Sequence, residues 1–142
     1  MPKKKIQFAT LAFPAKIAAA AAPQPMSSGE RYLLALLDSQ RALKLALDAL
    51  IARAAVAGQD ESAYIEVQKG NIKADYLKLD AMLNAYLSSQ AVFKPISQEE
   101  LVNIRAILDR MQAFTAQKDK ASAIMQAATD LLNEWSPDDA QE

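Results

Sequence analysis

The sequence predicts an all-α protein, and three observations carry this prediction. Alanine and leucine supply 29 and 17 of the 142 residues, whereas the strand-favouring valine and threonine number four and three. Two Ser-x-x-Glu capping boxes each precede an apolar stretch. Apolar residues then recur at steps of three and four, which is the helical period. We therefore expect an elongated antiparallel bundle with coiled-coil-like packing over residues 27–136, after an extended N-terminal arm (1–26) and before an acidic tail (137–142).

The first predicted helix covers residues 28–57. Ser27 and Glu30 form its capping box, and Gly58 suits the left-handed position that ends many helices. Further leucines and an isoleucine widen its apolar stripe beyond a two-helix seam, so we expect neighbouring helices on more than one side. The stripe consists of Leu33, Leu36, Gln40, Leu43, Leu47, Leu50 and Ala54, widened by Leu34, Leu37, Leu45 and Ile51.

The second predicted helix, residues 62–93, has the most regular pattern in the chain. Five of its apolar residues are spaced seven apart, which is the coiled-coil period. Lys69 is a polar residue within this stripe, and we expect its aliphatic stem to pack while its ammonium reaches solvent. The heptad residues are Ile65, Ile72, Leu79, Tyr86 and Phe93.

The third predicted helix, residues 98–135, follows Pro95 and begins at the capping box of Ser97 and Glu100. Its apolar stripe keeps phase to the end, which favours one continuous helix and hence a three-helix bundle. The alternative is a break within 115–120, the least apolar part, which contains Lys118 and would give four helices. The short connections at 58–62 and 94–97 force neighbouring helices to run antiparallel.

The residue types exclude several kinds of chemistry. The chain has no histidine and no cysteine, which rules out disulfides, thiolate nucleophiles, Ser-His-Asp triads and the usual zinc sites. Adjacent carboxylates occur at 60–61, 99–100 and 138–139, at helix starts or in the tail, where acids favour the helix dipole and solvent. We therefore predict no catalytic residues, no metal and no cofactor, and leave a carboxylate enzyme as a remote alternative.

The charges are unevenly distributed along the chain. Residues 1–26 carry four lysines and no acid, whereas residues 95–142 carry nine acids and four bases. The net charge is only −1, and basic side chains do not cluster on the predicted helices, so nucleic acid is not favoured as a partner. Head-to-tail contact between oppositely charged ends of two subunits would build rings or open filaments.

The arm is the predicted contact segment, because its apolar residues fall outside the periodic pattern of the helices. It can fold back on its own bundle or dock on another molecule, and we favour docking. The sequence thus predicts a non-enzymatic interaction protein, an assembly subunit or adaptor that binds its own copies or a protein partner through the arm and a bundle face. The predicted partner-binding residues are Lys3, Lys4, Lys5, Ile6, Phe8, Leu11, Phe13 and Ile17.

The alternative is an exported or membrane-active helical protein. Residues 1–22 have the basic start, apolar stretch and small residues of a secretory signal. The fit is imperfect, because the apolar run from Ile6 to Phe13 is eight residues long and Lys16 follows it, whereas a spanning helix needs about 20 apolar residues. We therefore expect a cytoplasmic or assembly-bound chain, with membrane contact and export as the less favoured alternatives.

Overall fold

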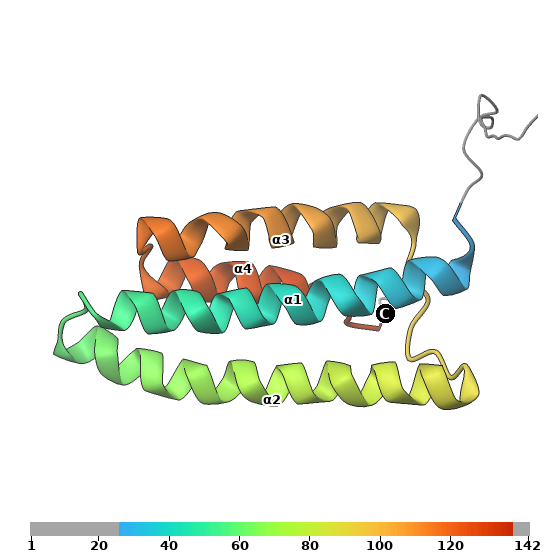
Figure 1. The fold of residues 1–142 in the computed structure, drawn as a ribbon, viewed down its shortest axis with the longest axis horizontal. Helices are drawn as coiled ribbons and strands as arrows, with labels where there is room; N and C mark the ends of the chain where they lie inside the picture. Colours follow the sequence, from blue (N-terminus) through green and yellow to red (C-terminus); the bar gives the residue numbers. More distant parts are fainter. Residues whose placement is uncertain (1–25, 138–142) are drawn as a thin grey trace, which may run out of the picture.

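The computed structural model describes residues 26–137, which form four α-helices (Figure 1). This confirms the predicted all-α class. The predicted arm up to residue 25, with all eight predicted contact residues, and the tail from residue 138 lie outside the described residues. The helices are α1 (Ser28–Ala54), α2 (Gln59–Ser89), α3 (Gln98–Gln117) and α4 (Ala121–Glu134).

Helix α1 is the centre of the bundle. It packs against each of the other three helices, and it lies between α2 and α3, which do not pack directly against each other (Figure 1). Ten residues of α1 are buried, compared with three in α2, although α2 is the longer helix. The expectation that the first helix has neighbours on more than one side is therefore confirmed.

Both predicted capping boxes are present. The Glu30 amide donates to Ser27 Oγ over 3.1 Å, and the Ser27 amide donates to Glu30 Oε1 over 2.8 Å. The same pair of bonds joins Ser97 and Glu100, at 3.0 and 2.8 Å. Helices α1 and α3 consequently begin at the residues predicted from the sequence.

The other helix ends differ from the prediction by a few residues. Helix α1 ends at 54 instead of 57, and α2 runs from 59 to 89 instead of 62–93. Gly58 does not take the predicted left-handed conformation: its φ of −74° and ψ of 179° make it the extended residue before α2. The left-handed end belongs instead to Gln90, with φ 61°, so Phe93 falls outside the helix and is half-exposed.

The favoured continuous helix over 98–135 is wrong, and the four-helix alternative is confirmed. Helix α3 ends where Lys118 turns left-handed at φ 50°, and α4 begins at Ala121 and folds back against α1. Hydrogen bonds from both sides of the connection between α1 and α2 hold this turn in place. Arg53 Nη1 donates to the Lys118 carbonyl over 3.0 Å, and the Ala121 amide donates to Glu61 Oε2 over 2.9 Å. Folding back buries an apolar face of α4 that a straight rod would leave in water.

One ion pair joins the two turns at this end of the bundle. The Arg53 guanidinium donates to both carboxylate oxygens of Glu61 over 2.9–3.1 Å. This hydrogen bonding, followed by the Ala121 amide, holds the pKa of Glu61 below its ordinary value. A bidentate pair that also caps α4 fixes the orientation of both turns.

At the other end of the bundle, the connection between α2 and α3 covers the part of α1 that the short helix α4 does not reach. With 14 residues, α4 is roughly 21 Å long and cannot reach the start of α1. Ile96 is buried there, and its carbonyl accepts from Arg31 Nε over 2.9 Å. The Phe93 amide donates to the Tyr32 hydroxyl over 2.9 Å, which ties the connection to α1.

An aromatic cluster closes the end of α4 over α1. The Tyr32 ring meets Trp135 edge-on with centroids 5.7 Å apart, and Tyr86 packs against Tyr32 at 5.1 Å. Trp135 Nε1 donates to Ser39 Oγ over 2.9 Å in buried surroundings. The indole thus has both an apolar environment and a hydrogen-bond partner, which a buried tryptophan needs.

Lys94 is a buried cation within the connection. Its ammonium donates to Glu100 and, over 2.7 Å, to the Glu134 carbonyl at the end of α4. Burial raises the pKa of Glu100, but the hydrogen bonds from Lys94 and the Ser97 amide outweigh that effect and leave the pKa below its ordinary value. The pair therefore links the start of α3 to the end of α4.

Replacing Ser39 tests the buried hydrogen bond. Ser39→Ala leaves the Trp135 indole N–H without a partner, and we expect a loss of about 1–3 kcal/mol in the free energy of unfolding, measured by urea denaturation. Trp135→Phe in the Ser39→Ala background removes the orphaned donor, so the two effects should not add. The exposed Ser88→Ala serves as the control and should be nearly neutral. Strict additivity of the first two changes would contradict the assigned bond.

The Lys94–Glu100 pair predicts a pH dependence. Because the folded pKa of Glu100 is lowered, its contribution to stability is complete above its unfolded pKa and is lost as the pH falls through the folded pKa. Glu100→Gln keeps an oxygen for the capping box, so it should lower the free energy of unfolding at pH 7 and make little difference in acid. Glu99→Gln is the matched control in the same helical turn. If both variants lost the same free energy of unfolding at pH 7, the effect of Glu100 would come from the helix dipole and not from its pair with Lys94.

Candidate functional site

The structure leaves the predicted contact residues of the arm untested, because all eight precede residue 26. Within residues 26–137, no helix is long and apolar enough to cross a membrane. In the same range, no three acidic side chains come together as a metal site would require. The remaining candidate for a site is the surface of the bundle.

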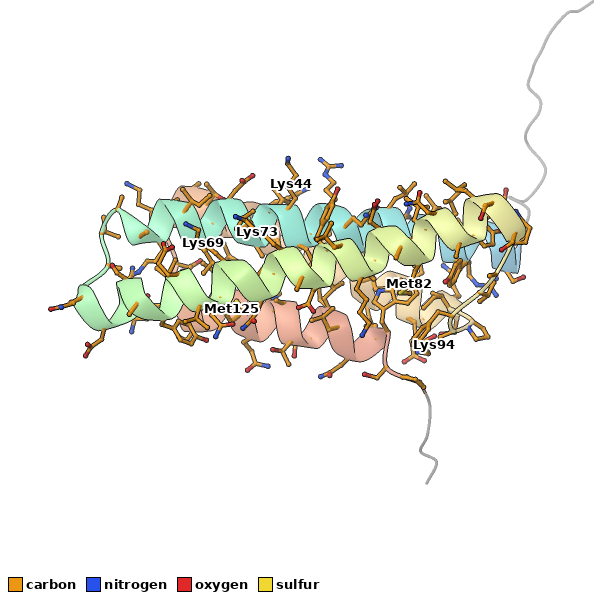
Figure 2. The ribbon with its side chains drawn as sticks, turned by 90° about the horizontal axis from the view of Figure 1, so that it is seen from below. Lys44, Lys69, Lys73, Met82, Lys94 and Met125 are labelled. Carbon is orange, nitrogen blue, oxygen red and sulfur yellow. The ribbon has the colours of Figure 1, made fainter. Side chains whose placement is uncertain are left out.

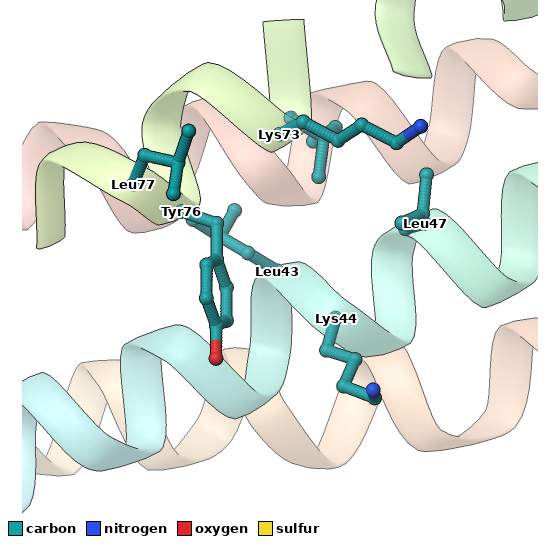
Figure 3. A pocket seen from close by; sticks show the side chains of 7 residues that line it. Leu43, Lys44, Leu47, Lys73, Tyr76 and Leu77 are labelled. Atoms are coloured by element: carbon teal, nitrogen blue, oxygen red, sulfur yellow. The ribbon is translucent and has the colours of Figure 1, made fainter. Parts of the chain in front are cut away.

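A groove lies between α1 and α2, and its volume is about 380 Å³ (Figure 3). Leu43 and Ile72 form its floor, because both are central residues of the seam between the two helices and are almost fully buried. Leu47 and Tyr76 are partly buried on its walls, and Leu77 stands at the edge with 66% of its surface exposed. The lining residues are Leu43, Lys44, Leu47, Ile72, Lys73, Tyr76 and Leu77.

Two lysines line opposite walls of the groove. Lys44 comes from α1 and Lys73 from α2, both are exposed, and neither forms an ion pair with another described residue. Lys69 lies on the same side of the helix pair (Figure 2) and pairs with Glu66 over 3.1 Å. Its side chain is 25% exposed, so the expectation that its stem packs and its ammonium reaches solvent is met. The groove thus has an apolar floor and cationic walls.

The apolar surface continues beyond the groove along α1. Leu37, Lys44 and Ile51 are spaced seven apart and form one exposed stripe, with Leu37 and Ile51 at 45% and 52% exposure. Asp48 is exposed one turn after Lys44. We call the groove together with this stripe the groove face; it consists of the groove lining and of Leu37, Asp48 and Ile51.

The sequence did contain a signal for this face. Leu34, Leu37, Leu45 and Ile51 all widen the apolar stripe of the first helix. Leu34 and Leu45 pack against the core, whereas Leu37 and Ile51 remain exposed. Periodicity places all four on the helix surface but does not say which of them a neighbouring helix covers.

A second hollow of about 210 Å³ lies between α2 and the end of α4. Burial raises the pKa of Asp75 there, and the nearby Lys78 opposes that rise. Asp75 is the one acid among the residues that line this hollow, so the hollow does not hold the pair of carboxyl groups that acid–base chemistry on two carboxylates requires. The groove face is therefore the stronger candidate.

Truncation of single side chains distinguishes the edge of the groove from its floor. Leu77→Ala should change the free energy of unfolding by less than about 0.5 kcal/mol, because the side chain is mostly in water. Ile72→Ala, the matched change five residues earlier on the seam, should cost about 2–5 kcal/mol. Both follow from urea denaturation monitored by circular dichroism. Similar losses in the two variants would show that Leu77 belongs to the core.

Comparisons with protein-family models, with curated proteins and with solved structures find no match to this chain. No role is therefore carried over to the groove face by similarity. Its geometry and charge are what a functional interpretation has to rest on.

Proposed function

We propose that this protein is a non-enzymatic helical interaction protein, an assembly subunit or adaptor. It binds its own copies or a protein partner through the N-terminal arm and the groove face of the bundle. The observation that carries the proposal is the grouping of half-exposed apolar side chains with unpaired lysines on two adjacent helices.

The groove face has the character of a contact surface. Scattered exposed leucines are ordinary, but Leu77 lines the groove, and Leu37 and Ile51 share one exposed stripe of α1 with Lys44, which also lines it. Full burial of an exposed side chain of this kind contributes about 1.5–3 kcal/mol. These three apolar side chains are already about half buried, so covering each contributes roughly half of that and still favours association. Apolar residues ringed by charged ones are also typical of interaction surfaces.

One member of each carboxylate pair in the bundle is engaged in structural contacts, which supports a role other than catalysis. Glu61 binds Arg53 and caps α4, and Glu100 binds Lys94 and completes a capping box. The chain also has no histidine and no cysteine. The residue type that most often acts as general base and the thiol nucleophile are therefore missing.

The arm supports the proposal by its composition and its point of attachment. Residues 6–13 are a largely apolar run without charge, and three lysines precede it. The arm joins the bundle at Met26, which packs against the core next to the start of α1. A chain of 25 residues can extend over about 80 Å, which exceeds the length of α2, so it can reach a neighbouring molecule.

Deletion of residues 2–25 tests the arm. The truncated chain should keep its helical circular dichroism and its thermal unfolding, because residues 26–137 contain the complete described core. Assembly, measured by light scattering at matched concentration, should be lost. Replacing Lys3, Lys4 and Lys5 by glutamine in the full chain is the control that separates charge from apolar contact.

Two outcomes would contradict the role of the arm in protein contact. Normal assembly of the truncated chain would remove the arm from the interface. Binding of the full chain, but not the truncated one, to vesicles containing anionic lipid, without any assembly in solution, would instead favour the membrane-active alternative.

A further inference from the structure

Lys44 and Asp48 present opposite charges on one exposed stripe of α1, four residues apart. Neither forms an ion pair with any residue in the range 26–137, not even with the other. A lysine that precedes an acid by four residues has the less favourable orientation for pairing within a helix. Both charges are consequently free to pair with another molecule.

The spacing of these two charges is self-complementary. When two copies of α1 lie antiparallel with their exposed stripes in contact, and cross midway between residues 44 and 48, Lys44 of each copy faces Asp48 of the other. This is the reciprocal pattern that a two-fold interface requires, in which residue i meets residue j and j meets i. A single pair of opposite charges on one helix face thus becomes two ion pairs.

The groove provides a place for the incoming carboxylate. Lys44 and Lys73 line its opposite walls (Figure 3), so Asp48 of a second copy that enters there meets two cations. Lys69, already paired with Glu66 over 3.1 Å, lies on the same side of the helix pair, as do Arg41 and Asp80. Arg41 would face Ile51 of the second copy and cover it with its aliphatic stem, while Asp80 is already bound by Gln40 over 3.2 Å.

The apolar part of the groove face fits the same arrangement. Leu37 and Ile51 flank the two charges along α1, and Leu77 stands on the facing helix. A second α1 lying over the groove covers these side chains while its own are covered in turn. Apolar burial then supplies affinity, and the charges set the register and suppress other registers.

We propose that the groove face is a self-complementary interface between two copies of this chain, held in register by reciprocal Lys44–Asp48 ion pairs. This inference rests on the proposed function and names a second copy as the partner of the bundle face. The arm takes no part in this two-fold contact, so deletion of residues 2–25 should remove assembly beyond two copies and leave the pair itself.

A charge-swap experiment on the full chain tests the interface. Lys44→Glu and Asp48→Lys each turn two attractive contacts into two repulsive ones, so each should weaken self-association about tenfold or more in sedimentation equilibrium at low salt. The double variant K44E/D48K restores opposite charges between residues 44 and 48 but brings the new lysine near the unchanged Lys73. It should therefore associate clearly more strongly than either single variant without reaching the original association constant. High salt should reduce all these differences.

Mixing the two single variants gives the sharpest readout. In a mixed pair, both reciprocal contacts join an acid to a base, so the mixture should associate more strongly than either variant alone. Lys78→Glu is the matched control, because it makes the same charge change on the side of α2 that faces the second hollow, and it should leave association unchanged. Circular dichroism verifies that the exposed substitutions leave the fold intact.

Three results would overturn the interface. The double variant associating as weakly as the single ones, or the mixture gaining nothing, would exclude the reciprocal pairs. Self-association that is lost on deletion of residues 2–25 but unaffected by every charge variant would exclude the groove face and leave the proposed function standing on the arm. A full chain that stays monomeric at all concentrations would exclude a contact between copies.

Discussion

The packing around α1 is the constraint on which the rest of the structure depends. The residues of α1 that face its neighbours alternate between small alanines and large leucines, so the other helices approach closely on the alanines and interdigitate with the leucines. Ala42, Ala46 and Ala49 have no exposed surface at all, and a larger side chain at any of them would have to displace a helix. Because α2 and α3 do not pack directly on each other, α1 is the element that joins them.

Polar contacts at both ends fix how the elements meet around this centre. Arg53 and Glu61 tie the two turns at one end, and Lys94 with Glu100 ties the connection, α3 and α4 at the other. Apolar packing alone tolerates sliding of one helix along another, whereas hydrogen bonds to particular carbonyls and amides do not. The polar contacts at each end of the bundle therefore fix how far the neighbouring helices are shifted along one another. The two sets of contacts lie at opposite ends of α1.

Local signals in the sequence predict the helix starts correctly, because a capping box is complete within four residues. The division between α3 and α4 could not be predicted in this way. The apolar stripe keeps phase through Lys118, and the turn there depends on Arg53 and Glu61, which are more than 50 residues away in the chain. Gly58 shows the same limit, because its identity permits a left-handed turn while its neighbours require an extended one. The groove face stayed undetected for a related reason: coverage by a neighbour is a tertiary property, and the pattern of Leu37 and Ile51 equals that of the covered Leu34 and Leu45.

The asymmetry of α2 connects the fold to the proposed binding surface. Only Ile65, Ile72 and Leu79 of its 31 residues are buried, so α2 is held mainly along one line on α1 and less extensively by the short α4. A helix attached along one line leaves a furrow beside that line, and here the furrow is the groove between Lys44 and Lys73 (Figure 3). Any molecule that fills the furrow adds a second line of contact to α2, and binding to the folded state alone raises its stability by mass action. A partner bound in this groove would therefore stabilise the packing of α2 on α1, and α2 is the helix with the fewest buried residues.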